Sequence, residues 1–172
     1  MKVTIDIPGL TKFYQAISTN SPVLVKTLKQ WAFRYRAFVQ RRFAQYSHGA
    51  GDWPKLSPRT IARRRKGKRN TSHVDILRDT GTLFRALQPE FLQLPGQLED
   101  INGIFQVEVG YGGPAKHPNG PATVADIASF HNFGMGHNPR RQIIVNPTPE
   151  LIVKMQEDAA RNLSKVGWDF TK

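Results

Sequence analysis

Three polar side chains near the middle of the chain have the types that metal-dependent hydrolysis requires. Asp75 and Asp79 are four residues apart, and His73 precedes them. A nuclease needs two or more carboxylates around a metal, with a His or Lys to move protons. A structural explanation competes, because Asp79 can cap the helix that follows and Asp75 can pair with Arg78. The spacing favours the structural explanation, and a metal-dependent nuclease is the least favoured of three hypotheses.

No other pattern in the chain is typical of an active site. The sequence has no cysteine, which excludes thiolate metal sites and thiol nucleophiles. The five histidines have no zinc-site spacing such as HExxH, and we interpret His131, in SFHNFG, as a packed or capping residue. Walker, GxSxG and dinucleotide motifs are absent, and GYGG at Gly110 lacks the helix that a phosphate loop requires. We therefore expect no enzyme activity, no metal and no cofactor.

A basic segment is the most informative feature of the sequence. It carries seven cations and no acid: Arg59, Arg63, Arg64, Arg65, Lys66, Lys68 and Arg69. Apolar anchors flank it, Trp53 and Leu56 on one side and Ile76 and Leu77 on the other. Like-charge repulsion should keep the segment solvated until it meets an anionic surface. We expect an extended basic arm at about residues 50–75 that contacts partners, together with Arg140 and Arg141.

The net charge is divided unevenly along the chain. Residues 1–70 hold 16 Lys and Arg against 2 acids, a net charge of +14, whereas residues 71–172 are close to neutral at −2. This asymmetry is expected of a protein that meets nucleic acid or an acidic protein surface on one side, although it could also serve solubility. No window approaches the about 20 apolar residues of a membrane span, and we expect a chain used without export.

Periodicity and capping signals predict four main helices and a few strands. The helices begin at Ser21-Pro22 (about 25 residues), Ser57-Pro58, Thr123 and Thr148-Pro149, and a shorter one is expected after Asp79 or Thr80. Strands are predicted at Val3–Ile7, Phe91–Leu94, Ile104–Tyr111 and Gln142–Val145. Four glycines and three prolines in Gly110–Pro121 predict an irregular, mobile loop at about 110–122.

Five blocks of sequence together resemble the phage virion morphogenesis, or tail completion, family. They are WPKLSPRTIARRRKG from Trp53, ILRDTGTLFRAL from Ile76, VEVGYG from Val107, IASFHNFG from Ile127 and PRRQIIV from Pro139, spread over about 90 residues. The chain departs from the family pattern in a longer Pro/Gly/His loop after GYGG and in the absence of a second proline in PRRQ. Residues of these blocks that we expect to be structural are Asp79, Thr80, Gly81, Leu83, His131, Phe133 and Gly134.

The resemblance implies a fold, a role and a location. It implies one α+β domain over residues 1–172, in which a small antiparallel curved sheet is flanked by a long amino-terminal helix and a carboxy-terminal helix. It further implies a structural protein without catalysis at the neck or tail end of the virion, assembled in the host cytoplasm. The implied partners are further copies of the chain, in a ring, and the portal or connector, tail tube or tail terminator proteins. No membrane contact is expected.

Two hypotheses remain ahead of the nuclease. The preferred one is a virion assembly protein that completes the tail or joins head to tail through ring contacts. The alternative is a basic DNA-binding protein of phage or prophage origin, in which Trp, Tyr and Phe are interleaved with Arg. Non-specific contact with packaged DNA is compatible with both. The sequence contains no helix-turn-helix spacing and no finger, and this lack of a DNA-reading element favours the assembly protein.

Overall fold

The computed structural model describes residues 22–66, 74–86, 100–101, 104–105, 110–111, 115–118 and 120–165. The chain forms two compact units, and the division falls within the long helix α2, Pro22–Ser47, between Ala37 and Phe38. Unit 1 contains residues 38–93 and 110–145, and unit 2 contains residues 2–37, 94–109 and 146–172. None of the helices within these described ranges is both long and apolar enough to cross a membrane.

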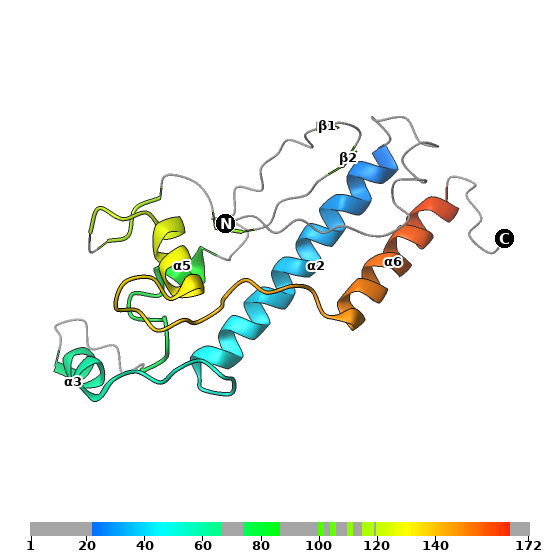
Figure 1. Cartoon of the computed structure of the whole chain (residues 1–172). Helices are drawn as coiled ribbons and strands as arrows, with labels where there is room; N and C mark the ends of the chain where they lie inside the picture. Colours follow the sequence, from blue (N-terminus) through cyan, green and yellow to red (C-terminus); the bar gives the residue numbers. More distant parts are fainter. Residues whose placement is uncertain are drawn as a thin grey trace. The chain divides into compact units, whose positions relative to one another are not determined.

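Unit 2 is built on the antiparallel packing of α2 against α6, Pro149–Ser164 (Figure 1). The Trp31 indole donates to the carbonyl oxygen of Met155 at 2.7 Å, and the Asn162 amide donates to Thr27 Oγ1 at 3.0 Å. Buried side chains fill the space between the helices: Leu28, Trp31, Tyr35, Met155 and Leu163. The prediction that the apolar stripe of α2 is held by tertiary packing is confirmed here.

One cation of α2, Arg34, obtains its counter-charge from α6. Arg34 makes two hydrogen bonds to the carboxylate of Asp158, which is only 5% exposed. This bond raises the pKa of Arg34. The pairing solves a problem visible in the sequence, since α2 itself contains no acid that could offset its Lys and Arg residues.

Unit 1 contains the carboxy-terminal part of α2, α3 (Pro58–Lys66), α4 (Thr82–Arg85) and α5 (Val124–Phe133). An aromatic cluster forms its core. The rings of Phe43 and Tyr46 meet the Trp53 ring edge-on with centroids 5.3 and 5.5 Å apart, and Phe84 lies 5.4 Å from Phe43. Edge-to-face contacts of this kind suit the ring quadrupoles and add to the energy of burial.

The predicted curved sheet is wrong for the part of the chain that the structure describes. That part has regular β-structure only in β1, Asp100–Ile101, and β2, Ile104–Phe105, which pair antiparallel, and an isolated bridge joins Lys116 to Thr123. The strand predicted at Gln142–Val145 is not formed, because the amides of Ile143 and Ile144 donate to the Asn132 side chain instead of a neighbouring strand. The strands predicted at Val3–Ile7 and Phe91–Leu94 lie outside the described residues.

Helix predictions that rested on local capping chemistry are confirmed. Thr123 and Asp126 form a reciprocal capping box at the start of α5, and the Thr148 hydroxyl accepts from the amide of Leu151 at α6. The amide of Thr60 donates to the Ser57 hydroxyl, which caps α3. Of the two caps expected for α4, Asp79 is wrong, because Gly81 occupies the cap position with φ 72°. The Thr80 hydroxyl, the other candidate, accepts from the amide of Thr82, the first residue of α4, at 3.3 Å.

Gly134 ends α5 in the left-handed conformation, φ 71°. A Cβ atom at this position would lie 3.0 Å from the Cβ of Arg140 and 3.1 Å from its amide nitrogen. Gly136 has a similar φ of 65°, but a Cβ atom there would meet nothing within 4 Å. The two glycines therefore share the backbone requirement and differ in crowding.

We predict that Gly134→Ala lowers the free energy of unfolding by about 2–3 kcal/mol, as strain and crowding add, whereas Gly136→Ala costs about 1 kcal/mol from strain alone. Urea denaturation of both variants measures the difference. Equal losses would show that Arg140 does not crowd this turn.

Candidate functional site

The loop at Trp53–Lys55 and the segment at Arg141–Gln142 hold each other in unit 1. The Trp53 indole donates to the Gln142 carbonyl at 3.2 Å, and Arg42 donates to the same oxygen. In return, the Arg141 guanidinium donates to the Pro54 carbonyl through Nε at 3.0 Å and Nη2 at 2.9 Å. Trp53 and Arg141 are both 5% exposed. These two predicted partner contacts are therefore structural in the isolated chain.

Helix α5 also binds the segment that begins at Arg141. The backbone amide of Arg141 donates to the His131 carbonyl at 2.7 Å, and Asn132 Oδ1 accepts from Ile143 and Ile144 at 2.9 and 3.0 Å. Asn132 is 3% exposed, so its amide oxygen satisfies two backbone donors that are shielded from water. Nothing in the sequence singled out Asn132, since a polar residue near a helix end is usually exposed.

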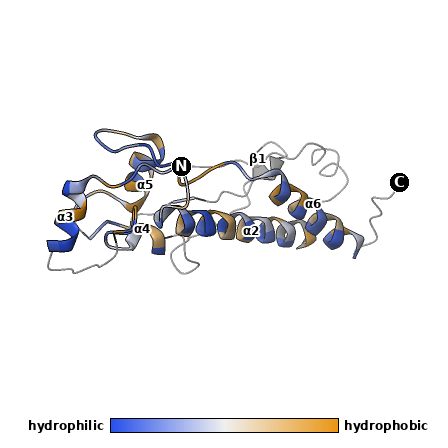
Figure 2. Ribbon diagram, turned by 90° about the horizontal axis from the view of Figure 1, so that it is seen from below, coloured by the Kyte–Doolittle hydropathy of each residue, from blue (hydrophilic) through white to orange (hydrophobic). Residues whose placement is uncertain are grey.

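The described part of the basic arm contains the helix α3 and is only partly solvated. α3 exposes four of the predicted contact residues, Arg59, Arg63, Arg65 and Lys66, and its ribbon is largely hydrophilic in Figure 2. Arg64 differs, because its side chain is 8% exposed and its Nη1 donates to the Asp75 carbonyl at 2.6 Å. The expectation that the whole middle of the arm stays solvated is wrong at this residue. Lys68 and Arg69 lie outside the described residues.

The two carboxylates of the hypothetical nuclease site, Asp75 and Asp79, contact different partners. Asp75 contacts His48 at 3.2 Å and Arg78 at 3.4 Å, which confirms the expected pairing with Arg78. Asp79 Oδ1 lies 3.3 Å from Arg64 Nε. Between them, Leu77 adopts a left-handed conformation with φ 60°. The chain is therefore not helical here, and a spacing of four residues does not place the two carboxylates on one face.

Histidine and acidic side chains form no alternative metal site in the described ranges. Those ranges contain no group of three His, Cys, Asp or Glu side chains placed to hold a metal ion. His73 lies outside them.

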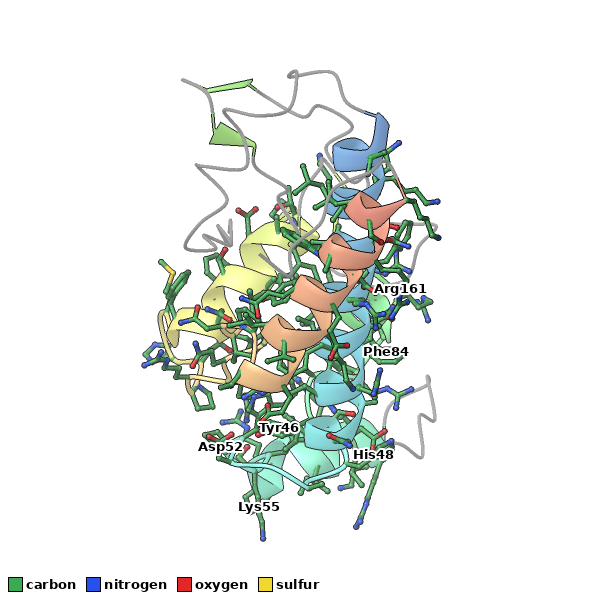
Figure 3. The ribbon with its side chains drawn as sticks, turned by 90° about the vertical axis from the view of Figure 1, so that its right-hand side faces the viewer. Tyr46, His48, Asp52, Lys55, Phe84 and Arg161 are labelled. Carbon is green, nitrogen blue, oxygen red and sulfur yellow. The ribbon has the colours of Figure 1, made fainter. Side chains whose placement is uncertain are left out.

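A pocket of about 470 Å³ opens in unit 1 between the loop at Lys55, α3, the segment at Leu77–Leu83 and α5 with the turn that follows it. Its polar lining includes Lys55, Arg63, Arg64, Arg141 and Asp79. Figure 3 shows the Lys55 side chain extending away from the ribbon. Sequence analysis missed this pocket, because its walls come from four separate stretches of the chain: residues 55–64, 77–83, 117 and 127–141.

Three histidines also line the pocket. The Thr80 hydroxyl lies 3.2 Å from His117 Nε2, and both residues are half-buried, whereas His137 is exposed. His131 is half-buried, and its Nδ1 has no hydrogen-bond partner among the described residues although water does not reach it. Burial and the nearby charges of Arg141 and Arg64 lower the pKa of His131 to about 4.

The positive charge of Arg64 acts on the guanidinium of Arg141 in this pocket. Burial lowers the pKa of Arg64, with Asp79 opposing the shift, and burial followed by repulsion from Arg64 lowers the pKa of Arg141. The Nε of Arg64 is buried and makes an ion pair with Asp79, but it has no hydrogen-bond partner in the described part of the chain. Of these two shielded guanidiniums, Arg64 is paired with the Asp79 carboxylate, whereas Arg141 donates to the backbone carbonyls of Pro54 and Lys55.

The remaining predicted residues have scattered roles. Leu83 is buried in the core of unit 1, and Leu56 is half-buried beside the pocket. Arg140 is exposed, and its backbone and Cβ atoms would crowd a side chain at position 134. Three apolar side chains at the end of α5 and in the turn after it are exposed: Phe130, Phe133 and Met135. Phe133, expected to be structural, is 58% exposed.

Comparison with known proteins gave no relatives. No protein-family model, curated protein or solved structure matches the chain. The family resemblance therefore rests on the five sequence blocks, and the site must be interpreted from its own geometry.

The low pKa of His131 predicts a pH-dependent stability. The folded chain binds this proton less readily than the unfolded chain, whose histidine has a pKa near 6.5. The stabilisation is complete above that value and is lost as pH falls from about 6.5 towards 4. We expect a loss of about 2 kcal/mol, discounted for the partial exposure of the ring.

Urea unfolding at pH 7 and pH 5 measures this loss, and proton NMR of the ring follows the titration directly. His131→Gln should show a weaker decline between the two pH values. A His131 resonance that titrates at or above pH 6.5 would contradict the burial on which the prediction rests.

Proposed function

We propose that this chain is a structural virion assembly protein that completes the tail or joins head to tail in a tailed phage. The observation that carries the proposal is that four of the resembling blocks pack together in unit 1. Trp53 and Arg141 join the first block to the last, Asn132 joins the fourth to the last, and Arg64 and Asp79 join the first two. Residues that were grouped by resemblance are thus one physical unit.

The surface of unit 1 supports a role in docking. α3 presents Arg59, Arg63, Arg65 and Lys66 to solvent, and the end of α5 presents Phe130 and Phe133. Charged groups accelerate and orient the encounter of preformed parts, and exposed apolar side chains lose contact with water once the parts meet. A neck or tail-end protein needs both, because it must recognise its neighbours and then remain attached.

The proposed partners follow from that role. Copies of the chain would close into a ring, which places the same basic helix at regular positions around an axis. Portal or connector, tail tube or tail terminator proteins would meet this ring at the neck or tail end of the virion. Packaged DNA would contact the ring without sequence preference.

Electron microscopy of particles made with and without the chain tests the proposal. We expect full heads and finished tails that fail to join, or tails with uncontrolled ends, when the chain is absent. Neutralising the four exposed cations of α3 to Gln should reduce joining about tenfold or more if they guide docking. The matched control neutralises four exposed cations of unit 2, Lys26, Lys29, Lys154 and Lys165. Normal virions without the chain would defeat the proposal.

A DNA-binding protein of phage or prophage origin is the second candidate, favoured by the exposed cations of α3 and the absence of an acid within that helix. Each phosphate neutralised on duplex DNA contributes about −0.9 to the slope of log K against log salt concentration. The α3 variant should therefore reduce the magnitude of the slope by about 3.6 if all four cations contact phosphates. Equally weak binding at low and moderate salt would eliminate this candidate.

A further inference from the structure

The pocket in unit 1 has the size and the charge of a binding site for an anionic group. Its volume of about 470 Å³ lies within the range that small ligands and side chains occupy in proteins. Lys55, Arg63, Arg64 and Arg141 contribute four positive charges to its lining, whereas Asp79 contributes one negative charge. The lining therefore has a net charge of +3 when its histidines are neutral.

The hydrogen-bond donors in the pocket are incompletely used. Arg64 is 8% exposed, and its Nε has no hydrogen-bond acceptor in the described part of the chain. His131 Nδ1 is equally shielded from water and unpaired. Buried polar atoms usually have partners, and each unpaired one costs free energy that an incoming acceptor would recover. An incoming acceptor would bond to Arg64 Nε, which now has only its ion pair with Asp79, and to His131 Nδ1 in the tautomer that carries the proton on this nitrogen.

The apolar part of the lining distinguishes between kinds of anion. It is aliphatic: Leu56, Leu77, Leu83 and Ile127 line the pocket, and no Phe, Tyr or Trp is among the described residues that do so. A nucleotide base would lack the aromatic platform on which bases stack. A duplex cannot insert its backbone into a pocket of this size, whereas a flexible Glu or Asp side chain can. Arginine also matches the two oxygens of a carboxylate.

We propose that this pocket binds a carboxylate-bearing peptide segment of a partner protein, with an aliphatic residue beside the carboxylate. Arg64 and Arg63 supply the charge from α3, Arg141 supplies it from the opposite wall, and Leu56 and Ile127 contact the aliphatic neighbour. The proposal rests on the assembly function in naming a protein as the source of the carboxylate. It deepens that function by assigning one site to one kind of contact.

The experiment uses the full chain and a short peptide of alternating Leu and Glu, with a Leu-Gln peptide as the uncharged probe. Isothermal titration should give a dissociation constant below about 1 mM for the Glu peptide and at least tenfold weaker binding for the Gln peptide. The His131 pKa, followed by NMR, should rise when the Glu peptide binds, because a nearby negative charge favours the protonated ring.

Helix α3 offers one test variant and two matched controls on exposed residues. Arg63 lines the pocket, whereas Arg59 and Arg65 of the same helix do not. Arg63→Gln should weaken binding of the Glu peptide about fivefold, and Arg59→Gln and Arg65→Gln should leave it within about twofold. These exposed positions avoid the structural bonds of Arg64 and Arg141, so a folding failure does not obscure the result.

Three results would overturn the proposal. They are no binding of the Glu peptide up to about 1 mM, equal binding of the Gln peptide, or equal effects of all three arginine variants. Preferential binding of single-stranded or duplex DNA that depends on Arg63 would replace the carboxylate with phosphate. Self-association of the chain that is lost only in Arg63→Gln would replace the partner with a second copy.

The experiments distinguish a wrong pocket proposal from a wrong assembly proposal. If the peptide does not bind but particles without the chain still fail to join, the pocket proposal is wrong and the assembly function stands. If the peptide binds as expected but virions are normal without the chain, the carboxylate site stands and its assignment to virion assembly is wrong.

Discussion

Unit 1 depends on the reciprocal bond between the loop at Trp53–Lys55 and the segment at Arg141–Gln142. Each partner supplies a buried side-chain donor and a backbone acceptor, so neither can move without leaving polar groups unpaired. The Trp53 ring also joins Phe43 and Tyr46, which ties this contact to α2. The walls of the pocket, α3 and the end of α5, are positioned relative to this one connection.

Arginine serves two different purposes in the chain. Arg34, Arg64 and Arg141 make specific bonds to a carboxylate or to backbone carbonyls, and each belongs to the packing of its unit. Arg59, Arg63 and Arg65 lie on the surface of α3. A high net charge therefore does not describe one uniform surface. The positive half of the sequence divides into cations that build the fold and cations that remain for a partner.

The sequence predicted what depends on neighbouring residues and failed where distant residues decide. The capping box of Thr123 and Asp126 is complete within four positions, so the start of α5 could be predicted from the sequence. The alternation at Gln142–Val145 shows which side chains can face inward, but only the fold determines that Asn132 takes the amides. The ion pair of Arg64 with Asp79 likewise depends on the left-handed turn at Leu77, which no local sequence pattern predicts. The pocket combines four such distant segments and has no sequence signature of its own.

Side chains donate and main-chain oxygens accept in three of the contacts that organise unit 1. Trp53 bonds to the carbonyl of Gln142, Arg141 to that of Pro54, and Arg64 to that of Asp75. Every residue type has a backbone carbonyl, so positions 142, 54 and 75 retain these acceptors when their identities change. The donors have no such freedom. Substitutions should therefore accumulate at the acceptor positions 142, 54 and 75. Distant homologues would keep the donor side chains, a tryptophan and two arginines, while the acceptor residues diverge.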